Sequence, residues 1–445
     1  MKNRIKMKKV YIETYGCQMN QSDSEIVGAI VQENGYQLTN EILEADVIFV
    51  NTCSIRENAE QRVKNRITKF EHIKRKKPWV KIGVLGCMAE RMKDDLFVEN
   101  KLLDIVVGPD AYRDIPHLLD EVDSGVKAAN VLLSEEETYS EIVPVRIDTN
   151  GISAFISIMR GCENFCSYCV VPYTRGKERS RDYRTILEEA KDLFTKGYRE
   201  ITLLGQNVNS YHFEEGEDIS FAQLMEMVAQ ISPLLRVRFS TSHPKDISED
   251  LIKIIAKYDN ICNYIHLPIQ SGSNNMLKKM NRKYTREDYI KKIEMIRQYI
   301  PDAAISTDII TGFCGETIDD HKDTLSMMDY VGYDYAFMFN YSQRPNTIAE
   351  KKFVDDIPQE EKSRRLDEII VKQRELSFLS NKRDLGMEYE VLVEGRSKKN
   401  KDELFGRTSQ NKVVIFKKED LKLGQYIRVR INDCTSGTLI GERIS

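Results

Sequence analysis

The stretch Arg160-Gly-Cys-Glu-Asn-Phe-Cys-Ser-Tyr-Cys-Val-Val-Pro-Tyr-Thr-Arg-Gly176 contains three closely spaced cysteines, Cys162, Cys166 and Cys169. Closed structural zinc and iron–sulfur sites take four protein ligands, so three thiolates leave such a centre one ligand short. An open position is where a cofactor or substrate binds. The stretch therefore predicts an open metal centre. The alternative is a zinc site completed by Cys262 or by a histidine from elsewhere in the chain.

Three further cysteines, Cys17, Cys53 and Cys87, each follow a short apolar run, and helical patterns separate the runs. The runs cover residues 10–15, 47–50 and 82–85, and the helical patterns cover 24–34 and 57–77. This alternation indicates a parallel sheet with helices on both faces, where ligands collect at the carboxyl ends of the strands. One such thiol would be ordinary core packing, but three in equivalent places favour a second metal centre. We predict a doubly wound N-terminal parallel-sheet domain over residues 8–123.

The middle of the chain, residues 146–378, repeats a strand–helix pattern six times. The predicted strands are residues 154–159, 200–204, 236–240, 264–267, 304–310 and 335–340. Six such units predict a partial six-fold (β/α) barrel, whose functional groups lie on the loops that follow the strands. The loop after the first strand is the stretch 160–176.

The spacing of these cysteines, with Tyr168 before the last of them, resembles the signature of radical S-adenosylmethionine enzymes. Two three-cysteine groups in this order resemble the methylthiotransferases of that superfamily, from about residue 8 to the end. Two segments most resemble the tRNA branch that acts on isopentenyladenosine (MiaB type). They are residues 51–63, Asn-Thr-Cys-Ser-Ile-Arg-Glu-Asn-Ala-Glu-Gln-Arg-Val, and residues 170–176, Val-Val-Pro-Tyr-Thr-Arg-Gly.

The resemblance implies two 4Fe-4S clusters, with S-adenosylmethionine as radical source and methyl donor. The cysteines of the 160–176 loop would hold the cluster that cleaves S-adenosylmethionine, and the three upstream cysteines would hold an auxiliary cluster that supplies sulfur. The expected product carries a methylthio group on carbon 2 of isopentenyladenosine, next to the anticodon. Cofactor chemistry suits this carbon because it is unactivated toward ordinary nucleophiles.

The resemblance also implies residues that contact S-adenosylmethionine, on loops after the predicted strands. The candidates are Tyr168, Gln206, Asn207 and Gln270. Two histidines beside strand ends, His243 and His266, are predicted to be hydrogen-bonded structural groups. Relatives usually carry proline where this chain has Cys314. The three remaining cysteines, which are predicted to be plain packing, are Cys262, Cys314 and Cys434.

Length and composition describe an ordinary globular protein. The 445 residues suggest about three domains, with 41% hydrophobic and 31% charged residues. The sequence shows neither a transmembrane run nor the apolar stretch of a signal peptide. Nine cysteines in such a chain are typical of metal ligands and buried thiols. We expect a cytoplasmic monomer with no membrane contact.

The net charge of −4 is distributed unevenly. Residues 381–445 contain 14 Lys and Arg but 10 Asp and Glu, and residues 62–77 contain eight basic residues and one acid. The apolar positions of the second segment, Val63, Ile67, Phe70 and Ile73, keep helical spacing, which predicts an amphipathic helix with a basic outer face. That face is either a solvated surface or an RNA contact, because basic groups neutralise phosphates.

The last segment, residues 381–445, changes to the period-two alternation of β-strands. Five short strands predict a small closed all-β barrel, an architecture often used to bind oligonucleotides. The segment resembles the TRAM module of RNA-modifying enzymes, in which Phe405 and Arg407 would contact RNA. A docking or stability module is the alternative. The expected partners are the anticodon stem-loop of tRNA, an electron donor, and a source of sulfur or clusters.

Three other functions share parts of this pattern. Methylthiotransferases for threonylcarbamoyladenosine in tRNA, or for an aspartate of a ribosomal protein, use the same chemistry, but residues 54–62 favour the isopentenyladenosine branch. A non-catalytic iron–sulfur RNA binder that senses redox state needs no cofactor pocket. The loops 205–207, 266–272 and 311–316 therefore argue against it.

Overall fold

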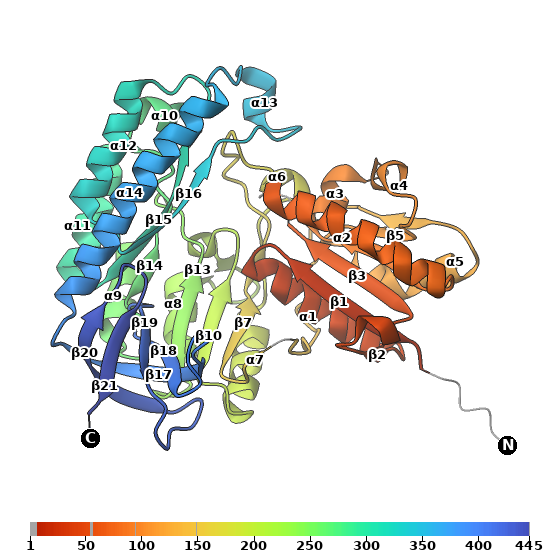
Figure 1. The fold of residues 1–445 in the computed structure, drawn as a ribbon, viewed down its shortest axis with the longest axis horizontal. Helices are drawn as coiled ribbons and strands as arrows, with labels where there is room; N and C mark the ends of the chain where they lie inside the picture. The colour runs from red at the N-terminus through yellow and green to blue at the C-terminus, as the bar shows by residue number, and fades with distance from the viewer. Residues whose placement is uncertain (1–6, 54–56, 94, 148, 445) are drawn as a thin grey trace. The chain divides into compact units, whose positions relative to one another are not determined.

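The computed structural model describes residues 7–53, 57–93, 95–147 and 149–444 (Figure 1). The chain forms two compact units. The first comprises Met1–Asp148, Met159–Asn164 and Cys169–Thr185, and the second comprises Thr149–Ile158, Phe165–Tyr168 and Ile186–Ser445. The stretch that carries Cys162, Cys166 and Cys169 thus contributes to both units.

The first unit is built on a six-stranded sheet in the order β2-β1-β3-β4-β5-β6, with every neighbouring pair parallel. One apolar core lies under α1 and α5, and a second lies under α2 and α3 on the other face. The predicted doubly wound sheet is therefore confirmed. The elements are β1 (Lys9–Tyr15), α1 (Gln18–Glu33), β2 (Gln37–Leu38), β3 (Val47–Thr52), α2 (Glu57–Lys76), β4 (Lys81–Leu85), α3 (Cys87–Met92), α4 (Asp95–Glu99), β5 (Ile105–Val107), α5 (Ile115–Asp123), β6 (Ala128–Asn130), β8 (Met159–Arg160), α6 (Val171–Thr174) and β9 (Arg179–Ser180).

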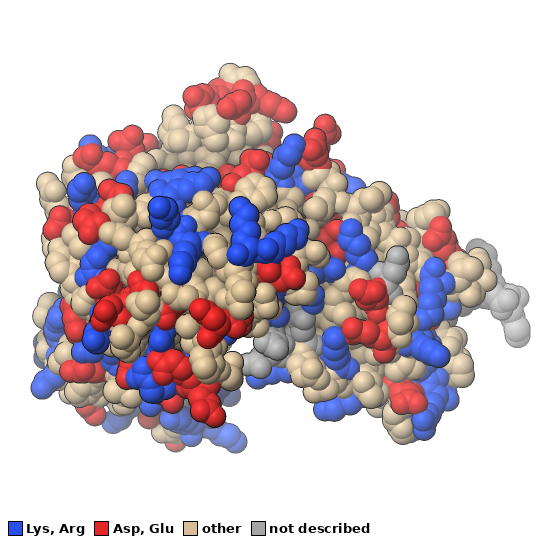
Figure 2. Space-filling model, turned by 90° about the horizontal axis from the view of Figure 1, so that it is seen from above, with Lys and Arg blue, Asp and Glu red and all other residues tan. Residues whose placement is uncertain are grey.

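Helix α2 has the predicted amphipathic form. Its four apolar positions are buried, whereas several basic side chains pair with carboxylates of the same unit. These pairs are Lys64–Glu99, Arg66–Glu13 and Lys74–Asp104. Such pairing favours the interpretation of a solvated helix face over an RNA contact. Figure 2 shows Lys and Arg side chains gathered on one face of the molecule, with Asp and Glu side chains around them.

The second unit contains six parallel strands in chain order, in two three-stranded sheets, β7-β10-β13 and β14-β15-β16. A parallel bridge joins Val237 of β13 to Ile261, three residues before the start of β14. This arrangement confirms the predicted partial barrel. The elements are β7 (Ser153–Ser157), α7 (Tyr183–Thr195), β10 (Glu200–Leu204), β11 (His212–Phe213), β12 (Ile219–Ser220), α8 (Phe221–Ala229), β13 (Arg236–Ser240), α9 (Glu249–Lys257), β14 (Tyr264–His266), α10 (Asn274–Lys279), α11 (Arg286–Tyr299), β15 (Ala304–Thr311), α12 (Ile318–Val331), β16 (Tyr335–Asn340), α13 (Ile348–Lys352) and α14 (Gln359–Arg383).

The C-terminal strands close into a five-stranded barrel in the order β17-β18-β19-β21-β20, which confirms the predicted all-β barrel. Alternate side chains of these strands form its interior, because successive residues of a strand point to opposite faces. The strands are β17 (Glu388–Arg396), β18 (Glu403–Arg407), β19 (Val413–Lys417), β20 (Tyr426–Cys434) and β21 (Leu439–Arg443). Among the described residues, no helix is both long enough and apolar enough to span a bilayer.

The barrel is anchored to the six-stranded part of the second unit through buried ion pairs. Arg407 donates to Glu200, at the start of β10, at 2.5 Å, and to Glu394 of β17 at 2.7 Å. Arg238 of β13 also pairs with Glu200 and donates to the carbonyl of Thr408 at 2.8 Å. The positive charges keep Glu200 ionised: burial opposes ionisation, but Arg238 and Arg407 lower the pKa to about 2.

Replacing Arg407 with alanine is expected to lower the free energy of unfolding by about 3–5 kcal/mol, because a buried carboxylate that loses its partner is strongly destabilising. The carboxylate that would lose its partner is that of Glu394, whose side chain is only 7% exposed. The matched control is Arg430→Ala, since Arg430 pairs with Glu388 but is 50% exposed, and little or no change in the free energy of unfolding is expected. Chemical denaturation followed by circular dichroism checks both. Equal stability losses in the two variants would contradict the anchoring role.

Candidate metal centres and cofactor site

The three upstream cysteines lie at the carboxyl end of the first sheet, as predicted. Cys17 follows β1 as the cap of α1, Cys53 follows β3, and Cys87 begins α3 after β4. A hydrogen bond with Cys53 lowers the pKa of the Cys17 thiol to about 6, and the nearby positive charge of Arg175 acts in the same direction. Cys17 and Cys53 are therefore close enough to interact, although they are far apart in the sequence.

Two glycines allow the chain to bring these cysteines together. Gly16 and Gly86 stand directly before Cys17 and Cys87, and both have positive φ values, +129° and +89°. A Cβ atom on Gly16 would lie 2.5 Å from the Cβ of Cys53, and one on Gly86 would lie 2.4 Å from Oδ1 of Asn51. Any side chain at either position would therefore push the loops apart.

A buried network of hydrogen bonds connects the helix and strands that form this edge of the sheet. Asn51 of β3 donates to the carbonyl of Asn20 at 2.9 Å and to the hydroxyl of Ser24 at 3.0 Å. Ser24 in turn lies 2.7 Å from the hydroxyl of Thr14 on β1. The network ties α1 to β1 and β3, so that the strand ends that carry Cys17 and Cys53 keep a fixed spacing.

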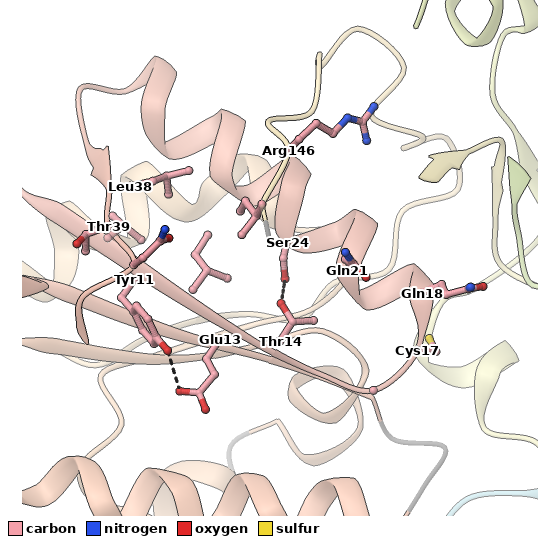
Figure 3. A pocket seen from close by; sticks show the side chains of 15 residues that line it. Tyr11, Glu13, Thr14, Cys17, Gln18, Gln21, Ser24, Leu38, Thr39 and Arg146 are labelled. Atoms are coloured by element: carbon pink, nitrogen blue, oxygen red, sulfur yellow. Dashed lines mark hydrogen bonds between the residues drawn. The ribbon is translucent and has the colours of Figure 1, made fainter. Parts of the chain in front are cut away.

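A cavity of about 720 Å³ opens beside Cys17 within the first unit (Figure 3). Its wall is formed by β1, the start of α1, the segment after β2, and Arg146 with Ile147. Cys17 is exposed, whereas Cys53 and Cys87 are buried. Of the three cysteines, Cys17 is the one that lines this cavity.

A buried cluster of charges lies next to Cys87. Arg160 and Arg175 donate to the two oxygens of Asp23 at 2.9 Å and 2.6 Å, and Arg175 also donates to the Cys87 sulfur at 3.2 Å. Burial alone would raise the pKa of Asp23, but the two arginines outweigh it and lower that pKa. The cluster places a permanent positive charge against one of the predicted ligands.

The loop after β7 presents its cysteines with polar neighbours of their own. In the first unit, Nδ2 of Asn164 lies 3.5 Å from the Cys162 sulfur, and the backbone amide of Cys162 donates to Gly176 at 3.1 Å. In the second unit, Nη1 of Arg282 donates to the sulfur of Cys166 at 3.2 Å. Each predicted centre therefore has one buried arginine on a cysteine sulfur.

The donor set of both sites fits an iron–sulfur cluster. Thiolates are the ligands that hold such clusters, and hydrogen bonds to their sulfurs are the usual means of tuning them. Among the described residues, no three His, Cys, Asp or Glu side chains surround one point as they would surround a single metal ion. A cluster does not require this arrangement, because each cysteine binds a different iron atom.

The zinc alternative fails for Cys262. This residue precedes β14, whereas Cys166 contacts Arg282, which donates to the carbonyl of Pro268 just after β14. Cys262 thus stands before β14, whereas Cys166 is linked through Arg282 to the segment that follows it. The three remaining cysteines are packing groups as predicted: Cys262 and Cys314 are buried, and Cys434 packs against the barrel core.

Several predicted cofactor contacts lie at the carboxyl ends of the second unit's strands. Oε1 of Gln206 and Oδ1 of Asn207 are buried and have no hydrogen-bond partner among the described residues. Gln270 is buried in a left-handed conformation at φ +72°, held by backbone hydrogen bonds to Asp308 and Ile310. Tyr168 is half-buried, with its hydroxyl 3.5 Å from Arg282. Unsatisfied acceptors in this position are what a ligand with donor groups would complete.

The two histidines have structural partners. Nδ1 of His266 lies 2.8 Å from the hydroxyl of Ser306. The backbone amide of Lys245 donates to Nδ1 of His243 at 3.2 Å. Burial, with the charge of Arg282 adding to it, lowers the pKa of His243 to about 2, so this imidazole stays neutral at physiological pH.

The two residues predicted to contact RNA occupy different settings. The Phe405 ring packs over Gly395 on the neighbouring strand. A Cβ atom added to Gly395 would lie 2.7 Å from that ring. Arg407 is engaged by Glu200 and Glu394, which gives it an anchoring role that the sequence did not indicate. Of the segment 54–62, which favours one tRNA branch, residues 54–56 and the side chains of 57–60 lie outside the described part.

Comparison with known proteins finds three family matches along the chain. Residues 9–108 match the Uncharacterized protein family UPF0004, residues 156–328 match the Radical SAM superfamily, and residues 382–444 match the TRAM domain. A radical S-adenosylmethionine methyltransferase from Kitasatospora setae, TsrM, shares the fold. It has a TM-score of 0.58 and 13% identity, over 77% of this chain and 75% of that one.

Two curated relatives match almost the whole chain, and both are named tRNA-2-methylthio-N(6)-dimethylallyladenosine synthase. The relative from Amoebophilus asiaticus is 56% identical over 98% of this chain and 92% of its own length. The relative from Bacteroides fragilis is 54% identical over 98% of this chain and 96% of its own length. The protein therefore belongs to the tRNA-2-methylthio-N(6)-dimethylallyladenosine synthase family, within the radical S-adenosylmethionine superfamily.

Proposed function

We propose that this protein adds a methylthio group to carbon 2 of isopentenyladenosine, also called N(6)-dimethylallyladenosine, beside the anticodon of tRNA. The observation that carries the proposal is the placement of Cys17, Cys53 and Cys87 at one sheet edge, in a chain that also matches the Radical SAM superfamily over residues 156–328. A second cysteine group has a reason to exist only if the reaction needs more than the cleavage of S-adenosylmethionine.

Each cysteine group is proposed to hold one 4Fe-4S cluster. When bound, the cluster at Cys162, Cys166 and Cys169 supplies electrons for reductive cleavage of S-adenosylmethionine, and the auxiliary cluster supplies sulfur. The protein groups hold the thiolates in place: Arg282 binds the Cys166 sulfur, and Arg175 binds the Cys87 sulfur. Gln206, Asn207, Gln270 and Tyr168 are proposed to bind S-adenosylmethionine. Support comes from the buried acceptor oxygens of Gln206 and Asn207, which lack protein donors.

The C-terminal barrel is proposed to contact tRNA. Its match to the TRAM domain supports this role, as does the exposed basic loop between β17 and β18, which contains Lys398, Lys399 and Lys401. Phe405 remains a proposed stacking residue. Because Arg407 is engaged by two carboxylates, the loop lysines are better candidates for phosphate contacts.

Further parts of the proposal follow from the reaction. The reaction needs an electron donor and a source of sulfur or clusters. We also propose that the protein is a monomer and that it acts in the cytoplasm, where tRNA is available. We also propose three domains, residues 8–123, 146–378 and 381–445. The matched family ranges fall inside these limits.

The alternative tRNA and ribosomal-protein substrates are disfavoured by the names of the relatives that match almost the full chain. The redox-sensing alternative is not an enzyme, and one experiment distinguishes it from the proposed function. Reduced, cluster-loaded protein incubated with S-adenosylmethionine is expected to release methionine and 5′-deoxyadenosine, detected by mass spectrometry. A sensor would bind iron and RNA but release neither product.

A further inference from the structure

Arg175 is a buried residue directly after α6, and its guanidinium contacts one of the predicted auxiliary-cluster ligands. Its Nε donates to the sulfur of Cys87 at 3.2 Å, and its Nη2 donates to Asp23 at 2.6 Å. The remaining nitrogen, Nη1, is buried and has no hydrogen-bond partner among the described residues. Buried donors are normally satisfied, so this one indicates an acceptor that the protein itself does not supply.

The guanidinium is held in place from several sides. Asp23, its carboxylate partner, is also bound by Arg160 at 2.9 Å and by the hydroxyl of Tyr112 at 3.4 Å. The carbonyl of Arg175 accepts a hydrogen bond from Arg179 at 2.9 Å. Since the whole side chain is buried, it cannot turn away from Cys87 without breaking these contacts.

The position of Arg175 in the sequence connects the two cysteine groups. It stands six residues after Cys169, and the short helix α6 between them contacts α3, the helix that begins at Cys87. The same segment therefore starts at a predicted ligand of one centre and ends on a predicted ligand of the other. Both ends of this segment belong to the first unit.

We propose that Arg175 is a positioning residue of the auxiliary site, an inference that rests on the proposed function. It fixes the Cys87 sulfur through Nε and sets the reduction potential of the centre held there. A hydrogen bond to a ligating sulfur and a buried positive charge both stabilise the reduced state, which carries one more negative charge. The rival interpretation is that Arg175 only neutralises Asp23, as part of a structural ion cluster.

The test uses full-length protein with Cys162, Cys166 and Cys169 replaced by alanine, reconstituted with iron and sulfide so that one centre remains. In this background the double variant Arg175→Met/Asp23→Asn removes both charges of the pair together, and Arg160, the other partner of Asp23, keeps Asp110 as a carboxylate partner at 3.5 Å. Its centre is expected to be reduced at a more negative potential, with a changed electron paramagnetic resonance spectrum. In the same background, the single variant Arg175→Lys keeps the positive charge but loses the planar guanidinium. Its reduction potential is expected to lie between those of the parent and the double variant.

The matched control is Lys74→Met/Asp104→Asn, which removes a half-buried ion pair of the same unit that contacts neither Arg175 nor a cysteine. Its potential and spectrum are expected to match those of the parent. A folded Arg175→Met/Asp23→Asn protein that binds no iron would also support the positioning role, provided that the control still binds iron.

Two outcomes would overturn the proposal, and they are distinguishable. If the Arg175→Met/Asp23→Asn centre keeps the parental potential and spectrum, Arg175 is only structural and the proposed function stands. If the folded parent binds no iron, there is no auxiliary centre, and both the proposed function and the role of Arg175 in it are wrong.

Discussion

Replacing Cys162, Cys166 and Cys169 with alanine is expected to remove about half of the bound iron and to abolish the cleavage of S-adenosylmethionine, because three of the six proposed thiolate ligands are lost. Replacing Cys17, Cys53 and Cys87 is expected to remove a similar share of iron. Cleavage of S-adenosylmethionine should survive in that second variant, but no methylthio group should be transferred. Iron analysis, product chromatography and nucleoside mass spectrometry measure the three quantities.

The control for both cysteine variants is Cys434→Ala, because this thiol belongs to neither cysteine group and packs against the barrel core. Its iron content and both activities are expected to match those of the parent. If either triple variant remains folded but loses all of its iron, the two groups do not bind independent centres, and the two-site account is wrong.

The enzyme is expected to discriminate between substrates by the prenyl group on the base. Burying five carbons at about 0.8 kcal/mol each contributes on the order of 4 kcal/mol, or roughly a thousandfold preference. Purified, cluster-loaded protein should therefore methylthiolate an anticodon stem-loop that carries isopentenyladenosine. It should largely ignore the same stem-loop with plain adenosine. Competition between the two RNAs in one reaction, read by mass spectrometry, measures the ratio directly.

Two outcomes of the competition would count against this substrate. Equal activity on both RNAs would show that the prenyl group is not recognised. Activity only on a threonylcarbamoyladenosine stem-loop, or only on a ribosomal protein, would place the enzyme in a different branch. Neither result would affect the expectation that S-adenosylmethionine is cleaved.

The arrangement of the parallel strands could be predicted from the sequence because many of them are short, largely apolar runs. Both faces of a parallel sheet are buried, so its strands need no alternation and stand out from their surroundings. The same reasoning predicted the convergence of Cys17, Cys53 and Cys87, since parallel strands end at one edge. The close approach itself also depends on Gly16 and Gly86, whose role becomes visible only in three dimensions.

Helix α14, of 25 residues, was not predicted because its buried side is largely polar. The buried positions are Lys362, Arg365, Ile369, Gln373, Ser377, Ser380 and Asn381. They bind backbone and side-chain groups of the second unit: Gln373 donates to the carbonyl of Tyr333 and Arg365 pairs with Glu316. A helix that docks through hydrogen bonds lacks the apolar periodicity that sequence reasoning detects.

The buried arginines next to the cysteines were also missed. Arg175 lies inside the quoted loop, but nothing in the sequence shows that its guanidinium contacts Cys87, 88 residues away. Arg282 reaches Cys166 across 116 residues. Arg407 was assigned to RNA because basic residues in such a module suggest phosphate contacts, whereas the structure pairs it with Glu200 and Glu394. Pairings over such distances depend on the complete fold.

The most direct test of the account is mass spectrometry of tRNA nucleosides from three strains that differ only in this protein: wild type, deletion, and deletion complemented with Cys87→Ala. The account predicts 2-methylthio-isopentenyladenosine in the wild type. It predicts unmodified isopentenyladenosine accumulating in the other two strains. Unchanged 2-methylthio-isopentenyladenosine in the deletion strain would contradict it.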